Sequence, residues 1–285
     1  MKKTLITLIL VLIIVFVALS LLSSGGEYAA EKLFYRAMKT NSKIVENPDV
    51  APPTQLTQVE NDLKKLIAKY PGANITKIAN ISLVEFYTTH KDYEKAIKVI
   101  SGIMETYKAD EIIMSTVHFM KGVIYEKQDN WPKALAEFRV LRDKYPYSQL
   151  GIQMPIYIAK YYDSKGQDAE ARSAYSEARS FYGKIEKDYS GKGLGFTASV
   201  LLLQTYMNTR SYEDAGRVLE ETINKYMGQT ALLQLFPQIE NIFVTKLNDP
   251  QKAVEIYKNI SEKMRDDRLK KVLQKRIEKL SGKVN

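Results

Sequence analysis

Residues 126–146 read EKQDNWPKALAEFRVLRDKYP, and this stretch decides the fold. A polar turn, QDN, precedes an amphipathic run of helical length, and the run stops at Tyr145-Pro146. Asn130 stands where a helix N-cap accepts backbone hydrogen bonds, and Pro132 is tolerated because the first helical turn needs few donors. Similar stretches lie before and after this one. The sequence therefore predicts a helix–turn–helix unit that is repeated along the chain.

An alanine opens the second amphipathic run of each copy, with spacings of 38, 37, 44 and 38 residues. These alanines are Ala96, Ala134, Ala171, Ala215 and Ala253. The residues nine positions earlier are Tyr87, Tyr125, Tyr162, Tyr206 and Val244. The residues four positions later are Ile100, Phe138, Tyr175, Leu219 and Tyr257. Because each copy holds two apolar-periodic segments joined by a short turn, we expect pairs of packed helices.

The pattern resembles the tetratricopeptide repeat (TPR). The best copy, 115–148, has Gly122, Tyr125, Ala134, Phe138 and Pro146 at the family's spacing. It departs from the family at His118 and Lys121, where the family usually has tryptophan and leucine. The resemblance covers about 77–260 and implies an all-α fold, an α-solenoid of about five to six TPR-like repeats. It also implies a non-enzymatic protein that binds other proteins or peptides.

The third copy is longer than the others. Eighteen residues separate Ala171 from the closing Tyr189, whereas eleven separate Ala134 from Tyr145. Seven added residues are nearly two helical turns and leave the apolar face almost in phase. We therefore predict a helix over 171–189 that runs two turns further and projects from the array. The following GKGLG (191–195) lacks the spacing of a phosphate-binding loop and is interpreted as a helix-ending turn.

Four regions follow from these patterns. Residues 1–26 form an N-terminal membrane anchor or signal peptide, 27–76 a degenerate first helix pair, 77–262 the TPR array, and 263–285 a basic C-terminal capping helix. In the last region Leu269, Leu273, Ile277 and Leu280 make one apolar stripe. The 23 residues from Lys263 carry nine Lys/Arg and three Asp/Glu, so six of the chain's nine net positive charges lie there. A cap with a polar outer face explains this tail better than a nucleic-acid surface.

The N-terminus indicates export. Lys2 and Lys3 precede an apolar run, 4–22, whose length fits a membrane-spanning helix better than the apolar core of a signal peptide. The lysines place the N-terminus in the cytoplasm and the repeats outside it. The expected location is the bacterial inner membrane, single-pass, with the repeats in the periplasm. The alternative is a soluble periplasmic protein after signal cleavage.

Residues suited to catalysis or metal binding are scarce. The chain has no cysteine, and its two histidines, His90 and His118, lie 28 residues apart. Neither has a second histidine or a cysteine beside it in the sequence to complete a metal or catalytic site. We therefore expect no catalytic residue, no metal and no cofactor, with His118 packed between helices.

The first helix of each TPR lines the groove in this family, which implies a partner-binding surface here. The corresponding residues are Ile81, Glu85, Phe119, Val123, Glu126, Ile156, Lys160, Val200, Gln204, Gln238 and Ile242. Only Lys160 stands at a position of the carboxylate clamp found in chaperone-binding members. The mixed apolar and polar set favours an amphipathic helix or an extended peptide.

The most favoured function is an adaptor on the periplasmic side of the inner membrane that binds partners during assembly or secretion of envelope components. The alternative is a permanent structural subunit of a larger envelope complex. In that case the convex face and the long 171–189 helix would be the docking surfaces.

Overall fold

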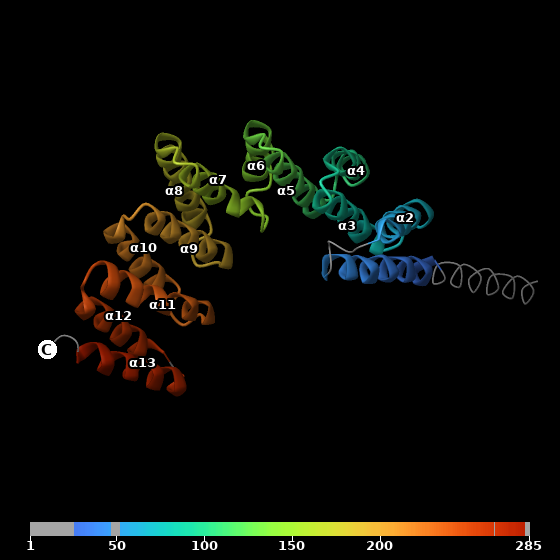
Figure 1. Ribbon diagram of the computed structural model, residues 1–285. Helices are drawn as coiled ribbons and strands as arrows, with labels where there is room; N and C mark the ends of the chain where they lie inside the picture. Colours follow the sequence, from blue (N-terminus) through green and yellow to red (C-terminus); the bar gives the residue numbers. More distant parts are fainter. Residues whose placement is uncertain (1–25, 47–51, 265, 283–285) are drawn as a thin grey trace, which may run out of the picture. The chain divides into compact units, whose positions relative to one another are not determined.

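The computed structural model describes residues 26–46, 52–264 and 266–282, and within these ranges every regular element is a helix (Figure 1). The chain divides into two compact units, Met1–Glu137 and Phe138–Asn285, called unit 1 and unit 2 below. No helix in the described ranges is long and apolar enough to cross a membrane. The predicted anchor at 4–22 lies outside the described residues.

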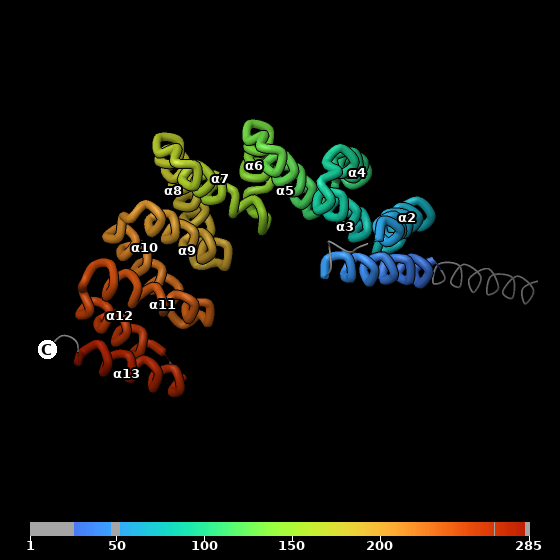
Figure 2. The backbone as a smooth tube through the Cα atoms, in the orientation of Figure 1, coloured from blue at the N-terminus to red at the C-terminus, as the bar shows by residue number. Residues whose placement is uncertain are grey.

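Unit 1 is a series of antiparallel helix pairs (Figure 2). It contains a helix over 26–46, α2 (Pro53–Lys69), α3 (Ile75–Thr89), α4 (Tyr93–Thr106), α5 (Glu111–Lys127) and the first half of α6 (Trp131–Lys144). The first two elements lie where the sequence predicts the front helix pair. A buried Asp62 on α2 joins them through an ion pair with Arg36.

Unit 2 continues with pairs of the same kind. It contains a 3₁₀ turn (Gly151–Gln153), α7 (Met154–Ser164), α8 (Asp168–Asp188), α9 (Gly193–Asn208), α10 (Tyr212–Lys225), a 3₁₀ segment (Thr230–Leu235), α11 (Phe236–Ile239), a π-helical segment (Glu240–Lys246), α12 (Pro250–Lys263) and α13 (Asp267–Ser281). The prediction of an all-α repeat fold is confirmed for the residues that the structure describes.

The residues that recur at fixed positions in each repeat form the core. The five alanines that recur in the repeats, from Ala96 to Ala253, are called the marker alanines. All five are buried, and so are the five residues four positions after them. A small residue at the first position lets the two helices of a pair approach, and the larger residue at the second fills the space beside it. The sequence pattern therefore predicted the packing as well as the helices.

A residue in the left-handed conformation ends the first helix of each repeat. It always lies five positions before the marker alanine and is Lys91, Asp129, Gly166, Arg210 or Asn248. In the first four repeats the backbone N–H of the next residue donates to the carbonyl of the tyrosine nine positions before the alanine, as in Asp92 to Tyr87 (2.8 Å). This is the bond of a Schellman helix end, so the turn geometry repeats even where glycine does not.

The N-cap predicted at Asn130 is confirmed, and two other repeats cap the corresponding helix in the same way. The side chains of Asp92, Asn130 and Asp249 each accept a hydrogen bond from the backbone N–H three residues later. Ser211 occupies the same position in the fourth repeat but makes no such bond. Its hydroxyl instead lies 3.3 Å from the Thr209 hydroxyl.

The long helix of the third repeat is confirmed, but its predicted projection is wrong. α8 has 21 residues, whereas α4, α6, α10 and α12 have 14 each. Its added turns carry Tyr182 and Ile185, both buried. The Tyr182 hydroxyl donates to the Ile152 carbonyl (2.9 Å) and accepts from the Ile156 N–H (3.2 Å). The extension is therefore held in the core, and burial raises the pKa of Tyr182 well above its ordinary value.

Close backbone approach explains two glycines of unit 2. Gly151 and Gly195 each lie six residues after a helix-closing tyrosine, and a Cβ at either place would meet that tyrosine's carbonyl oxygen. Gly191, with φ of +77°, turns the chain between α8 and α9. The GKGLG segment is thus a helix-ending turn, as predicted. Its last glycine allows the start of α9 to pack closely against the end of α8.

α13 lies in the region that the sequence predicts as the C-terminal cap. Leu273, Ile277 and Leu280 of α13 are buried, and Leu269 packs against the same core while partly exposed. Arg276 on the polar side forms an ion pair with Glu240. One apolar stripe thus closes the array, and the opposite face carries the charge.

Candidate functional site

A hollow of about 340 Å³ lies between the first helices of two successive repeats in unit 2. α9 supplies one wall, and the 3₁₀ segment, α11 and the start of the π-helical segment supply the other. The lining residues are Val200, Leu203, Gln204, Met207, Gln234, Leu235, Gln238 and Asn241. We call this hollow the amide groove.

The amide groove has an apolar floor and a neutral polar rim. Leu203 and Leu235 are buried beneath it, and Val200 and Met207 are partly exposed beside them. The rim consists of Gln204, Gln234, Gln238 and Asn241. None of the lining residues is charged. Side-chain amides both donate and accept hydrogen bonds, so this rim can bind the peptide groups of an extended segment.

The rim amides are largely available to a ligand. Gln204 and Gln234 are exposed, and the Asn241 amide donates only one long bond, to the Gln238 oxygen (3.4 Å). A pair of neighbouring amides can bind the N–H and C=O of one peptide unit, while an apolar side chain enters toward the floor. This arrangement recognises a polypeptide and supplies no acid, base or nucleophile.

Three of the predicted groove residues, Val200, Gln204 and Gln238, line this hollow. The prediction missed the other five lining residues. Leu203 and Met207 share a helical face with Val200 and Gln204, so the spacing i, i+3, i+4, i+7 on α9 contained that information. Gln234 and Leu235 lie in a 3₁₀ segment, which a period of 3.6 residues does not describe.

Two predicted groove residues are buried and were wrongly assigned. Ile156 is 4% exposed and Ile242 is 0% exposed. Ile156 follows the 3₁₀ turn that starts the first helix of its repeat, so its face differs from the one an uninterrupted helix predicts. Ile242 lies in the π-helical segment, whose i→i+5 bonds shift each later residue around the axis.

The same π-helical segment changes which residue holds the tyrosine position in the fifth copy of the repeat. Counting nine residues back from Ala253 assigns Val244 to the tyrosine position. In the structure the Asp249 N–H donates to the Phe243 carbonyl, so Phe243 holds that place. The extra residue in the turn explains why the sequence alignment lost the aromatic residue.

The remaining predicted groove residues are accessible on the first helices of other repeats. Ile81, Phe119, Val123 and Glu126 are partly exposed, and Glu85 and Lys160 are exposed. The prediction missed Ile78 and Ile112, which are 53% and 78% exposed on α3 and α5. Exposed isoleucines on these helices extend the apolar character of the first-helix surface within unit 1.

The histidines have local partners. His118 Nδ1 lies 2.7 Å from a carboxylate oxygen of Glu137, and Glu137 also forms an ion pair with Lys121 at 2.7 Å. Burial raises the pKa of Glu137, but the hydrogen bonds and charges of His118 and Lys121 outweigh it and hold the pKa below its ordinary value. His90 contacts the Phe86 carbonyl at 2.7 Å in its turn. In the described ranges no three His, Cys, Asp or Glu residues gather as a metal site.

One segment of the chain matches a known family. Residues 117–148 match the family model of the tetratricopeptide repeat. The matched segment is almost the same as the copy at 115–148 that the sequence marked as the best preserved. Tetratricopeptide repeats are generally non-enzymatic units that bind other proteins.

Two solved structures align with most of the chain at low similarity. One is BtubC (BKLC) from P. vanneervenii, with 13% identity, 87% of this chain and 92% of that chain covered, and a TM-score of 0.41. The other is a tetratricopeptide repeat protein from Parabacteroides merdae, with 11% identity, coverage of 89% and 99%, and a TM-score of 0.31. No curated protein matches the sequence.

Proposed function

We propose that this protein is a non-enzymatic adaptor that holds a segment of a partner protein in the amide groove. The observation that carries the proposal is the groove's composition, four amide side chains around a floor that includes Leu203 and Leu235. Amides recognise the main chain of a peptide, and the floor accepts an apolar side chain. Such a site selects extended, weakly charged segments.

We further propose that the adaptor works at the bacterial cell envelope. The support is the N-terminal sequence, in which Lys2 and Lys3 precede the apolar run 4–22. A run of this length with positive charges on its N-terminal side anchors a protein with the following domain exported. The partner would then be a protein that is assembled or secreted there.

The alternative of a permanent structural subunit loses one of its arguments. It relied on the long helix α8 as a projecting docking surface, but Tyr182 and Ile185 of the added turns are buried within unit 2. The amide groove, in contrast, is open to a ligand. We therefore favour reversible capture of a peptide segment.

Site-specific photocrosslinking tests the adaptor function. A benzoylphenylalanine placed at Gln204 of the full-length chain in its native membrane should crosslink a partner peptide. The same residue at the exposed Glu213 of α10 is the matched control and should give no crosslink. Adding Gln238→Arg should abolish the crosslink while leaving the circular dichroism spectrum unchanged. Equal crosslinking from both positions, or none from Gln204, would exclude the groove as a capture site.

Protease access tests the location separately. In intact cells the repeats should resist an added protease, and they should be digested once the outer membrane is permeabilised. Digestion in neither condition before cell lysis would contradict export, without bearing on peptide capture.

A further inference from the structure

A second hollow, of about 600 Å³, lies in unit 1 between α2, α3 and α4. Its position differs in kind from that of the amide groove. α2 and α4 are the second helices of their pairs, and α3 forms the floor between them. The apolar lining includes Ile67, Leu83, Val99 and Ile103. A volume of this size is typical of sites that hold several ligand side chains.

The rim of this hollow is positively charged. Lys64, Lys95 and Lys98 line it, and no acidic residue does. We call the hollow the lysine pocket. Lys98 has no ion-pair partner among the residues that the structure describes. A ligand with carboxylates would therefore find at least one unpaired ammonium group beside an apolar surface.

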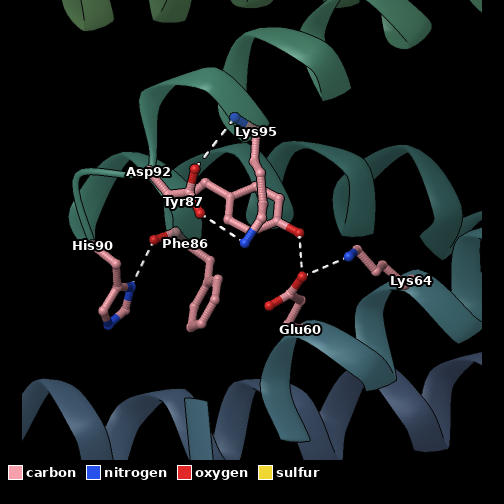
Figure 3. Close-up of polar contacts among 7 residues, drawn as sticks. All are labelled: Glu60, Lys64, Phe86, Tyr87, His90, Asp92 and Lys95. Carbon is pink, nitrogen blue, oxygen red and sulfur yellow. Dashed lines mark hydrogen bonds and ion pairs between the residues drawn. The ribbon is translucent and has the colours of Figure 1, made fainter. Parts of the chain in front are cut away.

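The other two lysines form ion pairs with acidic residues that lie outside the lining, and Figure 3 shows these contacts. Lys64 contacts Glu60 at 2.5 Å, and Glu60 also accepts a hydrogen bond from the Tyr87 hydroxyl (2.8 Å). Lys95 contacts Asp92 at 2.7 Å. Both ammonium groups lie within 6.0 Å of the centre of the Tyr87 ring. Each ammonium has three donors, so these contacts orient the lysines and leave donors for a ligand.

Gly102 provides an independent observation. It lies inside α4 and lines the pocket, and a Cβ built there would meet no atom within 4 Å. Glycine inside a helix costs roughly 0.5–1 kcal/mol relative to alanine. No packing contact within the protein requires the absence of a side chain here. Because no side chain stands at this position, a ligand in the pocket can approach the backbone of α4.

We propose that the lysine pocket binds an acidic amphipathic helix of a partner protein. Apolar side chains at i, i+3 or i+4 and i+7 would enter the pocket, and carboxylates beside them would meet the lysines. The lysines come from two helices on different sides of the pocket, so they match carboxylates spread along a segment. This arrangement fits a peptide better than the single headgroup of a lipid. The site is separate from the amide groove and takes a differently charged ligand.

Two glycine variants give a matched pair for the test. Gly102→Met places a side chain into the pocket from a position with room for it, so the fold should persist. Gly183→Met makes the same change in α8 of unit 2, where a Cβ also meets nothing within 4 Å. Lys98→Glu is a third variant, which reverses the unpaired charge.

The probe is a displayed library of random peptides of about 15 residues, or four helical turns. It is selected on the full-length chain in lipid nanodiscs. Selected peptides are synthesised with a fluorophore, and binding is measured by anisotropy. We expect acidic sequences with apolar residues at helical spacing. Gly102→Met should weaken them at least tenfold, about 1.4 kcal/mol, and Gly183→Met should not. Lys98→Glu and added salt should also weaken binding.

Three results would overturn the proposal. One is that no peptide is enriched. Another is that enriched peptides are basic or neutral, or bind Gly102→Met as tightly as the natural chain. The third is that laurate binds with the same sensitivity to Gly102→Met while no peptide does, which would make the pocket a lipid site. Since none of these variants changes a residue that lines the amide groove, failure here leaves the proposal for that groove unaffected.

Discussion

The lysine pocket of unit 1 and the amide groove of unit 2 are built from the same repeat but have opposite character. The first lies between second helices and has a rim of lysines, whereas the second lies between first helices and has a rim of uncharged amides. The same repeat therefore holds hollows at two different places, and the side chains at their rims set what binds. Salt should weaken binding at the first site and leave binding at the second nearly unchanged.

The two units also differ in the kind of ionisable group whose pKa is shifted. The described carboxyl groups whose pKa is lowered are Glu60, Asp92, Asp110 and Glu137, and all lie in unit 1. The largest pKa shifts in unit 2 belong to tyrosines, such as Tyr175 and Tyr257, whose pKa burial raises to about 12. Protonation of these carboxyl groups should therefore affect unit 1, whereas the large pKa shifts of unit 2 come from buried tyrosines.

The largest expected effect comes from removing the aromatic residue that holds α8. Tyr182→Ala should lower the free energy of unfolding by about 3–5 kcal/mol, because it leaves a cavity and two unpaired backbone groups. Urea unfolding followed by far-UV circular dichroism measures it, and Trp131, the single tryptophan, reports unit 1. The transition should shift more by dichroism than by Trp131 fluorescence. Tyr147→Ala, at a 55% exposed position, is the control and should cost below about 1 kcal/mol. Equal losses would contradict the role of Tyr182.

A pair of alanine substitutions should change stability in opposite directions in the two units. Gly195→Ala should destabilise by about 2–3 kcal/mol, because its Cβ would meet the Tyr189 carbonyl and the Tyr226 hydroxyl. Gly102→Ala should stabilise by roughly 0.5–1 kcal/mol, because its Cβ meets nothing and the helix gains from alanine. Thermal unfolding of both variants checks the signs. If Gly102→Ala destabilised the protein, the lysine pocket would not be an open space.

The smallest expected effect is the acid response of unit 1. Glu137 has a folded-state pKa below its unfolded value of about 4.3, so its pairing with His118 and Lys121 stabilises fully above that pH. The contribution is lost as pH falls through the folded pKa. Glu137→Gln should remove that part of the pH dependence, below about 1 kcal/mol for this partly exposed cluster. Urea midpoints from Trp131 fluorescence between pH 5 and about 3 measure it. An unchanged slope in the variant would show that other carboxyl groups carry the response.

Most of the fold could be predicted because it depends on local patterns. The marker alanines, the turn at 128–130 and the stripe on α13 each act within one helix pair, so their spacing is enough. The amide groove was predicted only in part. Its α9 wall follows a regular helical period, but the opposite wall begins in a 3₁₀ segment and continues into a π-helix. These segments change the number of residues per turn, so Ile242 was assigned to the surface and is buried.

The sequence by itself determined the helix pairs, their turns and the added length of α8, because periodicity and capping act over a few residues. Only the tertiary structure decided where that length goes, since Tyr182 is held by backbone groups of residues 152 and 156, far from it in the chain. It also decided which surfaces are hollow. The lysine pocket is a gap between α2 and α4, and whether a gap stays open depends on how side chains from three helices fill it.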